Sequence, residues 1–177
     1  HAYFDTTQLA KVAQPVLETL AQRTGEAASV ALLDGADCVF IARAATGTSF
    51  NGWIAVGARV SAYNTATGRV LLASRPPEEL DRLLVESPPR SLTPQSVLDP
   101  AALRKIIAQV RAQGYALCDE EVQIGSRSIA VPVHDRSGNV IAAMCLATYT
   151  SRATTDDIEG RLLPALDAGR RMLLAAL

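Results

Sequence analysis

Three acidic residues in a row stand in the segment GYALCDEEVQIGSRSIAVPV, residues 114–133, and their spacing could support chemistry. Adjacent carboxylates can ligate a hard cation or act as a paired acid and base. For Glu120 and Glu121, a loop at a strand end with solvated acids fits the pattern better than either kind of site. Asp119 ends an expected strand, where an inward carboxylate would be a recognition group for a ligand.

Cysteine and histidine are the other candidates, because they serve as nucleophiles, bases and metal ligands. Cys38, Cys118 and Cys145 are widely spaced and form no CxxC pair, which argues against a disulfide framework or a structural zinc site. No histidine neighbours Cys118 or Cys145, so both are expected to be small core side chains. His134 ends a strand beside an Asp-Arg turn, where a solvated side chain is expected. We therefore expect no catalytic residue, no metal ligand and no cofactor.

The segment TATGRVLLA indicates a different chemistry, the binding of an anion. Thr65, or Asn64 before it, can cap a helix whose first turn holds only small residues, among them Ala66 and Thr67. The free backbone N–H groups of such a helix end stay uncovered and attract a carboxylate or a phosphate. An ordinary capped helix fits the same residues, and the segment lacks the lysine and glycine spacing of a phosphate-binding loop.

Helices predicted from apolar spacing must position these groups. The first spans residues 9–21, with Thr6 or Thr7 as its cap and Gly25 at its end, and Pro15 predicts a kink or the start of a second helix. Further helices are predicted after the cap at 64–65, after the prolines at 76–77, from the cap at 99 to the glycine at 114, and from near 155 onward.

Strands are predicted where β-branched and aromatic residues gather between turn formers. Two of them flank Asp34-Gly35, a hairpin signature. The others are expected near residues 50–56, 115–119, 128–134 and 140–148. Strands in hairpin-like groups, with helices at both ends and in the middle, predict an α+β fold around a mostly antiparallel sheet rather than parallel winding.

Length and charge bound the class of protein. The chain has 177 residues, of which 17 are basic and 18 acidic, for a formal net charge of −1. One domain with its own core fits this length. Because a surface that holds nucleic acid unaided carries a basic excess, DNA binding is not expected of this piece. No apolar run approaches the roughly 20 residues of a membrane span and no signal-peptide pattern occurs, so a cytoplasmic location without membrane contact is expected.

The segments TATGRVLLA and DPAALRKIIAQVRAQGYALCDEEVQIGSRSIAVPVHDRSGNVIAAM resemble the effector-binding domain of IclR-type bacterial transcriptional regulators, and the resemblance runs over essentially the whole chain. It implies a GAF-like α+β fold for residues 1–177 and a separate N-terminal winged helix-turn-helix, absent here, that reads operator DNA. That absence agrees with the missing basic excess and with His1 as the first residue, so we expect a piece of a longer protein. The resemblance also implies dimers and dimers of dimers.

The resemblance implies a pocket for a small organic acid effector, with residues 114–133 as one wall. The amides at the helix start would face an acid group of the ligand, and the sheet would close the other side. The ligand-binding residues implied by the position-by-position match are Thr65, Ala66, Thr67, Cys118, Asp119, Ser126, Ser128, Cys145 and Ala147.

Departures from the family pattern bear on the ligand. Many relatives hold Asn or Ser at the positions of Cys145 and Ala147, and often Asp at that of Cys118, so this pocket is less polar and fits a very small oxo-acid such as glyoxylate or pyruvate poorly. The pattern with DPAALR and LLPAL resembles regulators of protocatechuate and 4-hydroxybenzoate catabolism, which implies an aromatic or dicarboxylic acid. Two alternatives stay open: a small hydrolase or isomerase using Asp119, Cys145 or His134, and a structural dimerisation module without a ligand.

Overall fold

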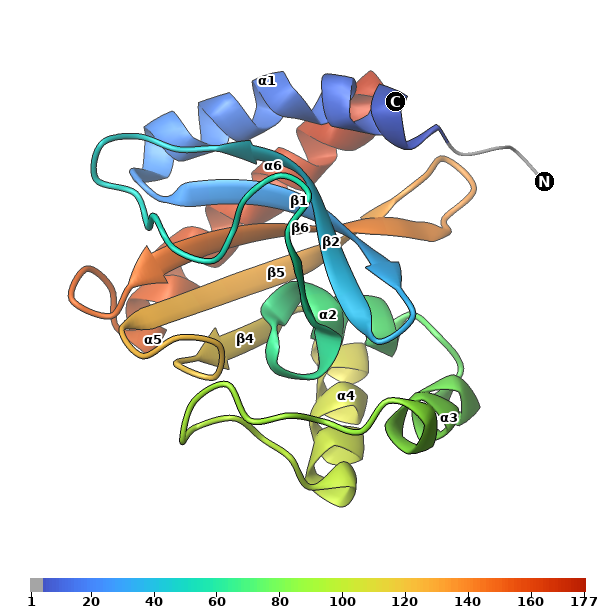
Figure 1. The fold of residues 1–177 in the computed structure, drawn as a ribbon. Coiled ribbons are helices and arrows are strands. Elements are labelled where there is room, and N and C mark those ends of the chain that lie inside the picture. Colours follow the sequence, from blue (N-terminus) through green and yellow to red (C-terminus); the bar gives the residue numbers. More distant parts are fainter. Residues whose placement is uncertain (1–4) are drawn as a thin grey trace.

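Across residues 5–177, the part of the chain that the computed structural model describes, an antiparallel sheet of six strands forms the centre of the fold (Figure 1). The strand order is β3-β2-β1-β6-β5-β4. All of these neighbours pair antiparallel, which confirms the α+β prediction. The strands are β1 (Ala27–Asp34), β2 (Asp37–Ala44), β3 (Arg59–Ser61), β4 (Ala116–Asp119), β5 (Ser126–His134) and β6 (Val140–Tyr149).

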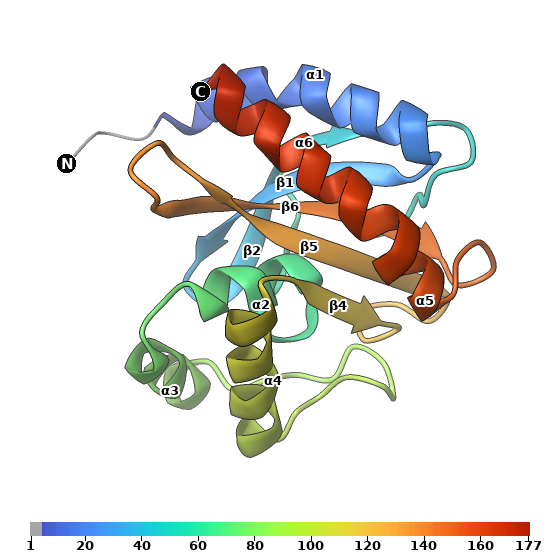
Figure 2. The same cartoon turned by 180° about the vertical axis from the view of Figure 1, so that it is seen from behind.

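Helices cover both faces of the sheet, as Figures 1 and 2 show from opposite sides. On one face, α1 (Thr6–Thr24) and α6 (Leu163–Ala176) pack against each other and against the strands. On the other, α2 (Ala66–Ala73) lies against β1, β4, β5 and β6, α4 (Pro100–Gln113) packs against α2, and α3 (Pro77–Glu86) contacts α4. We call these two sides the α1/α6 face and the α2 face.

The first helix differs from its prediction in two respects. Its cap is Asp5, whose carboxylate accepts a hydrogen bond from the amide of Thr7 at 3.0 Å, so the predicted cap at Thr6 or Thr7 is wrong by a residue or two. The helix also runs without a break through Pro15. Packing explains its continuity, because buried side chains on both sides of the proline lie against the sheet: Leu9, Ala13, Val16, Leu17, Leu20 and Ala21.

The strand predicted near residues 50–56 is wrong, because this stretch is a loop and the strand β3 comes after it. The aromatic and β-branched residues that suggested a strand anchor the loop instead: Phe50 and Ile54 are buried in the core on the α2 face. The amide of Gly57 donates to the carbonyl of Phe40 at 2.8 Å, so the loop joins β2 just before β3 begins.

Most other local predictions are confirmed. The hairpin around Asp34-Gly35 forms β1 and β2, and Asp99 caps α4 with a bond from the amide of Ala102 at 3.2 Å. Gly114 ends α4 with φ at +85°, a conformation that glycine adopts without strain. The last helical segment begins after Thr154 as α5 (Thr155–Asp157) and passes through a π turn, η2 (Ile158–Leu162), into α6.

Each face of the sheet carries its own core. The α1/α6 face buries side chains from β1, β5 and β6 against the two terminal helices, and the α2 face buries side chains from the same strands against α2 and α4. Within residues 5–177, no helix combines the length and the apolar character that crossing a bilayer requires.

Candidate functional site

The start of α2 is built as the sequence predicts. A short turn, η1 (Ala62–Asn64), leads into the helix, and the hydroxyl of Thr65 accepts a hydrogen bond from the amide of Gly68 at 3.1 Å. Gly68 is required because a Cβ there would lie 2.2 Å from a carbonyl oxygen of the preceding turn. Within the described chain, the amides of Ala66 and Thr67 have no hydrogen-bond partner. The helix start therefore keeps two donors free, as the binding of an anion needs.

The sheet beside this helix start is made of small side chains. In register, Cys118 pairs with Ser128, Ser128 with Ala147 and Ala147 with Ala27. The next row contains Ala116, Ala130, Cys145, Ser29 and Arg43. Residues that pair directly in an antiparallel sheet point to the same face, so both rows face α2. The fold thus brings together seven of the predicted residues: Thr65, Ala66, Thr67, Cys118, Ser128, Cys145 and Ala147.

Two predicted residues do not join the centre of this group. Asp119 follows Cys118 in β4, so its side chain points to the opposite face, where it is 49% exposed and accepts a bond from Arg127 at 2.7 Å. Because adjacent strand residues alternate between faces, Cys118 and Asp119 cannot both point into one pocket, and the prediction that placed both there conflicts with this alternation. Ser126 lies at the start of β5, where its hydroxyl donates to the carbonyl of Gln123 at 2.9 Å and closes the preceding corner.

Three buried polar atoms around this face have no hydrogen-bond partner within residues 5–177: Ser29 Oγ, Arg43 Nε and Trp53 Nε1. Ser29 pairs across the sheet with Arg43 on one side and Cys145 on the other, so its hydroxyl lies among the predicted site residues. A buried donor or acceptor left unpaired costs about 1–3 kcal/mol. Native structures rarely leave several such groups together, so the cluster indicates a place where another molecule supplies the partners.

The loop of residues 45–58 carries the aromatic part of the site. The ring of Trp53 meets Phe40 and Phe50 edge-on, with centroids 5.7 and 6.2 Å apart. The guanidinium of Arg43 donates through Nη2 to the carbonyl of Phe50 at 2.9 Å, which ties the loop to β2. An arginine bordered by aromatic rings can hold the carboxylate of a flat ligand whose ring packs on those side chains.

None of Ser29, Arg43 and Trp53 is predicted from the sequence. Arg43 does carry a signal, because it is a charged residue inside the otherwise apolar strand end VFIARA. Ser29 and Trp53 carry none, because a serine in a strand and a tryptophan in a loop are common. The pairing of β1 with β2 brings Ser29 beside Arg43, and the contact of Arg43 with Phe50 brings in the loop that carries Trp53.

The centre of the site is buried, since the side chains of Ser29, Thr65, Thr67 and Cys145 are buried. Arg43 and Trp53 at its edge are half-buried. A surface hollow of about 260 Å³ opens nearby, but it is lined by other residues, among them Asp37, Tyr63 and Arg90, and by none of the predicted ones.

The three thiols are neutral groups in this environment. Burial raises the pKa of Cys38 to about 11 and that of Cys145 to about 12, and burial also raises the pKa of Cys118 well above its ordinary value. Cys118 donates to the carbonyl of Asn64 at 2.8 Å and thereby links β4 to the start of α2. A nucleophilic cysteine needs a lowered pKa, so these thiols act as walls and weak donors rather than as nucleophiles.

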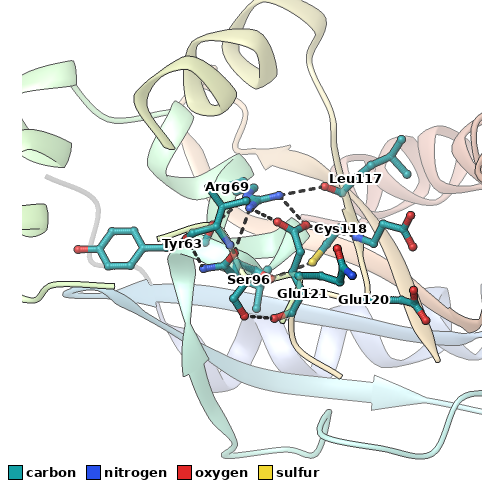
Figure 3. Close-up of polar contacts among 12 residues, drawn as sticks. Tyr63, Arg69, Ser96, Leu117, Cys118, Glu120 and Glu121 are labelled. Atoms are coloured by element: carbon teal, nitrogen blue, oxygen red, sulfur yellow. Dashed lines mark hydrogen bonds and ion pairs between the residues drawn. The ribbon is translucent and has the colours of Figure 1, made fainter. Parts of the chain in front are cut away.

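One of the three consecutive acids is not solvated as predicted. Glu121 is buried and forms a two-pronged ion pair with Arg69 of α2, with Oε1–Nη2 at 2.6 Å and Oε2–Nη1 at 2.9 Å (Figure 3). Glu120 takes a positive φ of 58° at the corner, and its carboxylate accepts from the amide of Gly125 at 2.9 Å. The correction has a simple cause: the buried cation that Glu121 needs comes from a helix 52 positions earlier in the chain.

Comparisons with known proteins show the family to which the chain belongs. Residues 1–172 match the family described as bacterial transcriptional regulator IclR C-terminal. The Pca regulon regulatory protein of Pseudomonas putida is 41% identical over 174 residues, which are 98% of this chain and 60% of that protein. BhcR of Paracoccus denitrificans, named as an HTH-type transcriptional regulator, is 31% identical over 97% of this chain and 61% of its own length. The chain thus spans about three-fifths of the curated relatives it matches.

Two solved structures share the fold. The inducer-binding domain of PobR from Acinetobacter, a double mutant in complex with 3-hydroxybenzoic acid, has a TM-score of 0.87 and 30% identity over 93% of this chain and 97% of that one. An IclR homologue from Microbacterium hydrocarbonoxydans in complex with 4-hydroxybenzoate has a TM-score of 0.86 and 26% identity over 98% of this chain and 70% of that one. The relatives are regulators rather than enzymes, and the chain belongs to the IclR family of bacterial transcriptional regulators, as its C-terminal effector-binding domain.

Proposed function

We propose that this domain senses an aromatic acid of catabolism, bound between the start of α2 and the small-residue face of the sheet. The observation that carries the proposal is that Ser29, Arg43 and Trp53 keep polar atoms without partners around the α2 face of the sheet, which is also the face where α2 begins with free amides. It gives one face of the sheet a guanidinium Nε–H, a hydroxyl and an indole N–H without protein partners, while Nη2 of the same guanidinium holds the carbonyl of Phe50. A benzoate with a ring hydroxyl supplies the acceptors and the flat apolar body that such a place fits.

Each part of the ligand meets a matching group. The carboxylate accepts from Arg43 and from the amides of Ala66 and Thr67, since a guanidinium and a helix start both favour negative charge. The ring packs against Phe50 and Trp53, and a ring hydroxyl accepts from the indole N–H. Binding therefore supplies the hydrogen bonds that the ligand-free site lacks.

The low polarity of the sheet face supports a ring over a very small oxo-acid. Cys145 and Ala147 offer a thiol and a methyl group where a small oxo-acid would need donors. Names of relatives point the same way: one is a Pca regulon regulatory protein, and two solved relatives hold hydroxybenzoates. This comparison favours the aromatic over the dicarboxylic acid.

Signalling requires more than occupancy. In our proposal the full protein is a dimer or a dimer of dimers that contacts operator DNA through a preceding winged helix-turn-helix, and the ligand favours one arrangement of the paired domains. A ligand with equal affinity for both arrangements would switch nothing.

Thermal unfolding with a ligand panel tests the proposal. 4-Hydroxybenzoate, 3-hydroxybenzoate, protocatechuate, adipate and pyruvate are each titrated into the chain and into the variant Arg43→Gln. A ligand that binds only the folded state stabilises it by roughly 2.7 kcal/mol at about 100 times its dissociation constant. We expect a rise in melting temperature with at least one hydroxybenzoate, none with pyruvate, and its loss in Arg43→Gln.

The matched control is Arg59→Gln, which removes a strand arginine that pairs with Asp34 at 2.9 Å on the surface of β3. It should respond to the ligand as the parent chain does. Silence of the parent chain with all five acids would contradict the proposal and favour a structural module without a ligand. Chemical turnover of any of them would favour the enzyme alternative.

A further inference from the structure

Three segments that are far apart in the sequence meet at Arg69: the first turn of α2, the corner after β4, and the irregular stretch of residues 87–99, which we call the strap. The side chain of Arg69 is 3% exposed and that of its partner Glu121 is 10% exposed. Figure 3 shows the pair between α2 and the corner, with Ser96 of the strap beside it. A buried ion pair at such a junction fixes how the segments lie relative to one another.

The guanidinium of Arg69 has no donor left for a ligand. Besides its two bonds to Glu121, Nε donates to the carbonyl of Tyr63 at 2.8 Å, Nη1 to the carbonyl of Leu117 at 3.4 Å, and Nη2 to the side-chain oxygen of Asn64 at 3.4 Å. An arginine has five N–H groups, and five bonds use all of them. Arg69 therefore acts on its neighbours and not on the effector.

The strap is fastened through the same junction. The side-chain amide of Asn64 donates to the carbonyl of Val97 at 3.0 Å and accepts from the amide of Val97 at 2.7 Å. The hydroxyl of Ser96 donates to the carbonyl of Glu121 at 2.7 Å, and the hydroxyl of Thr93 donates to the carbonyl of Glu120 at 2.7 Å. These bonds join residues 93–97 to the residues that hold the ion pair.

The junction also adjoins the effector site. Asn64 precedes the cap Thr65, and its carbonyl accepts the thiol of Cys118 at 2.8 Å. A shift of Asn64 therefore moves the helix start, whose amides face the site, and one of the thiols that line the sheet. The position of the strap and the shape of the site are thus set by one hydrogen-bonded unit.

Stability alone does not explain a buried ion pair, because well-packed apolar residues of similar volume often stabilise a fold equally or better. We propose that Arg69 and Glu121 are positioning residues of the effector site, and that through them the strap and the start of α2 move as one unit. The part of the proposal that concerns ligand affinity rests on the function proposed above. The part that concerns the coupled movement of the strap and the start of α2 does not depend on that function.

The test uses the double variant Arg69→Met/Glu121→Leu, which leaves no unpaired charge. Amide hydrogen exchange without ligand is followed at Val97, bonded to Asn64, at Gly68, bonded to Thr65, and at Leu146 in the central strand β6. We expect Val97 and Gly68 to exchange at least tenfold faster and by the same factor, with Leu146 unchanged. A pair that only stabilises the whole fold would change all three amides alike, and that result would overturn the proposal, as would no change at Val97 and Gly68.

A second arm measures the affinity for 4-hydroxybenzoate as probe. We expect a loss of about tenfold, within the roughly 5- to 150-fold range of coupling between sites. The control Arg104→Gln/Asp81→Asn removes a surface pair between α4 and α3, with Nε–Oδ1 at 2.7 Å, and should change neither exchange nor affinity. If the parent chain does not bind 4-hydroxybenzoate, the proposed function fails for this ligand while the exchange result still decides the positioning role.

The single variant Ser96→Ala serves if the double variant does not fold. It removes one bond from the strap and leaves the ion pair in place. Faster exchange at both Val97 and Gly68 would support the unit. Faster exchange at Val97 alone would contradict it, because the strap would then loosen without the helix start.

Discussion

The two faces of the sheet are built from the same strands and differ in the size of their side chains. On the α1/α6 face, β5 and β6 present Ile129, Val131, Met144 and Leu146, all of them buried among the terminal helices. On the α2 face the alternate residues of the same strands are small: Ser128, Ala130, Ala143, Cys145 and Ala147. Alternation along each strand allows one sheet to carry two environments with separate tasks.

This difference in side-chain size indicates which face of the sheet stabilises the domain and which face binds a ligand. Large side chains on the α1/α6 face gain hydrophobic free energy at about 25 cal/mol per Å² of buried apolar area. Among the described residues, the buried polar atom without a partner that lies outside the α2 face is Oε2 of Glu26, whose Oε1 accepts from Arg152 at 2.9 Å. The α2 face holds the unpartnered atoms of Ser29, Arg43 and Trp53, which oppose folding. One face thus holds the domain together, and the other keeps groups that a bound molecule can satisfy.

The largest expected effect is on the packed face. Leu146→Ala removes a fully buried side chain and should lower the free energy of unfolding by about 2–5 kcal/mol, because the cavity it leaves closes only in part. Urea denaturation measures the loss. Under conditions where the variant and the parent chain are both folded, their affinities for the effector should be similar. A loss of affinity as large as that of Arg43→Gln would contradict the assignment of stability to one face and binding to the other.

A larger side chain on the α2 face should reduce both stability and ligand binding, whereas the same change on the α1/α6 face should reduce stability alone. Ala147→Leu places three extra carbons between β6 and α2, at a destabilisation of about 1–3 kcal/mol, and should abolish binding. Its control is Ala142→Leu, in the same strand but facing the terminal helices, and equally buried. We expect similar destabilisation from both and a loss of binding from the first only, measured by calorimetry. Binding by Ala147→Leu would place the effector elsewhere.

Alkaline pH should weaken the fold through the site face. Burial raises the pKa of Cys38 to about 11 and of Cys145 to about 12, from an ordinary value of 9.0. Below pH 9 these thiols are neutral in both states and stability does not change. As pH rises above 9, the unfolded chain loses these protons first, so stability falls by about 1.4 kcal/mol per pH unit for each thiol, until pH passes the folded pKa.

Urea denaturation at pH 8, 9.5 and 10.5 measures this slope. The variant Cys38→Ala/Cys145→Ala should show a flatter decline than the parent chain over the same range. An equal decline in both would mean that other groups, such as Tyr63 with its pKa raised by burial to about 12, control the alkaline limit.

Local signals in the sequence are enough for most of the fold. Asp99 and Gly114 mark the ends of α4, Asp34-Gly35 marks the hairpin, and Thr65 caps α2, because each of these depends on residues a few positions apart. The stretch 50–56 fails for the opposite reason: its aromatic residues are buried by contacts from distant strands, and propensity alone cannot distinguish an anchored loop from a strand.

The site is less predictable, because it depends on register. A bulge between Val30 and Ala31 leaves Ile41 without a partner and changes the phase of β2, so that Arg43 shares a face with Ser29. No local pattern in the sequence reveals such a shift. The burial of Glu121 is hidden in the same way, since it follows from a contact with a residue 52 positions away.

The smallest expected effect comes from removing one of two buried hydroxyls, that of Thr24 outside the proposed site or that of Ser29 within it. Thr24 ends α1, donates to the carbonyl of Leu20 at 2.8 Å and accepts from the amide of Glu26 at 3.2 Å. Thr24→Val removes both bonds and should lower stability by about 1–3 kcal/mol. Ser29 Oγ has no well-aligned partner and only the weak thiol of Cys145 beside it, so Ser29→Ala removes a poorly satisfied group and should leave stability unchanged or raise it by up to about 1 kcal/mol. Opposite signs for two similar substitutions would be hard to obtain from packing, since each removes one oxygen from a buried position.

Effector affinity completes this comparison. Ser29→Ala should weaken binding although it does not weaken the fold, because the hydroxyl finds its partner only in the complex, whereas Thr24→Val should leave affinity unchanged. Urea denaturation and calorimetry on the two variants give the four values needed. If Ser29→Ala destabilises the ligand-free chain as much as Thr24→Val does, Ser29 already has a partner in solution, and the unpartnered cluster no longer marks the binding site.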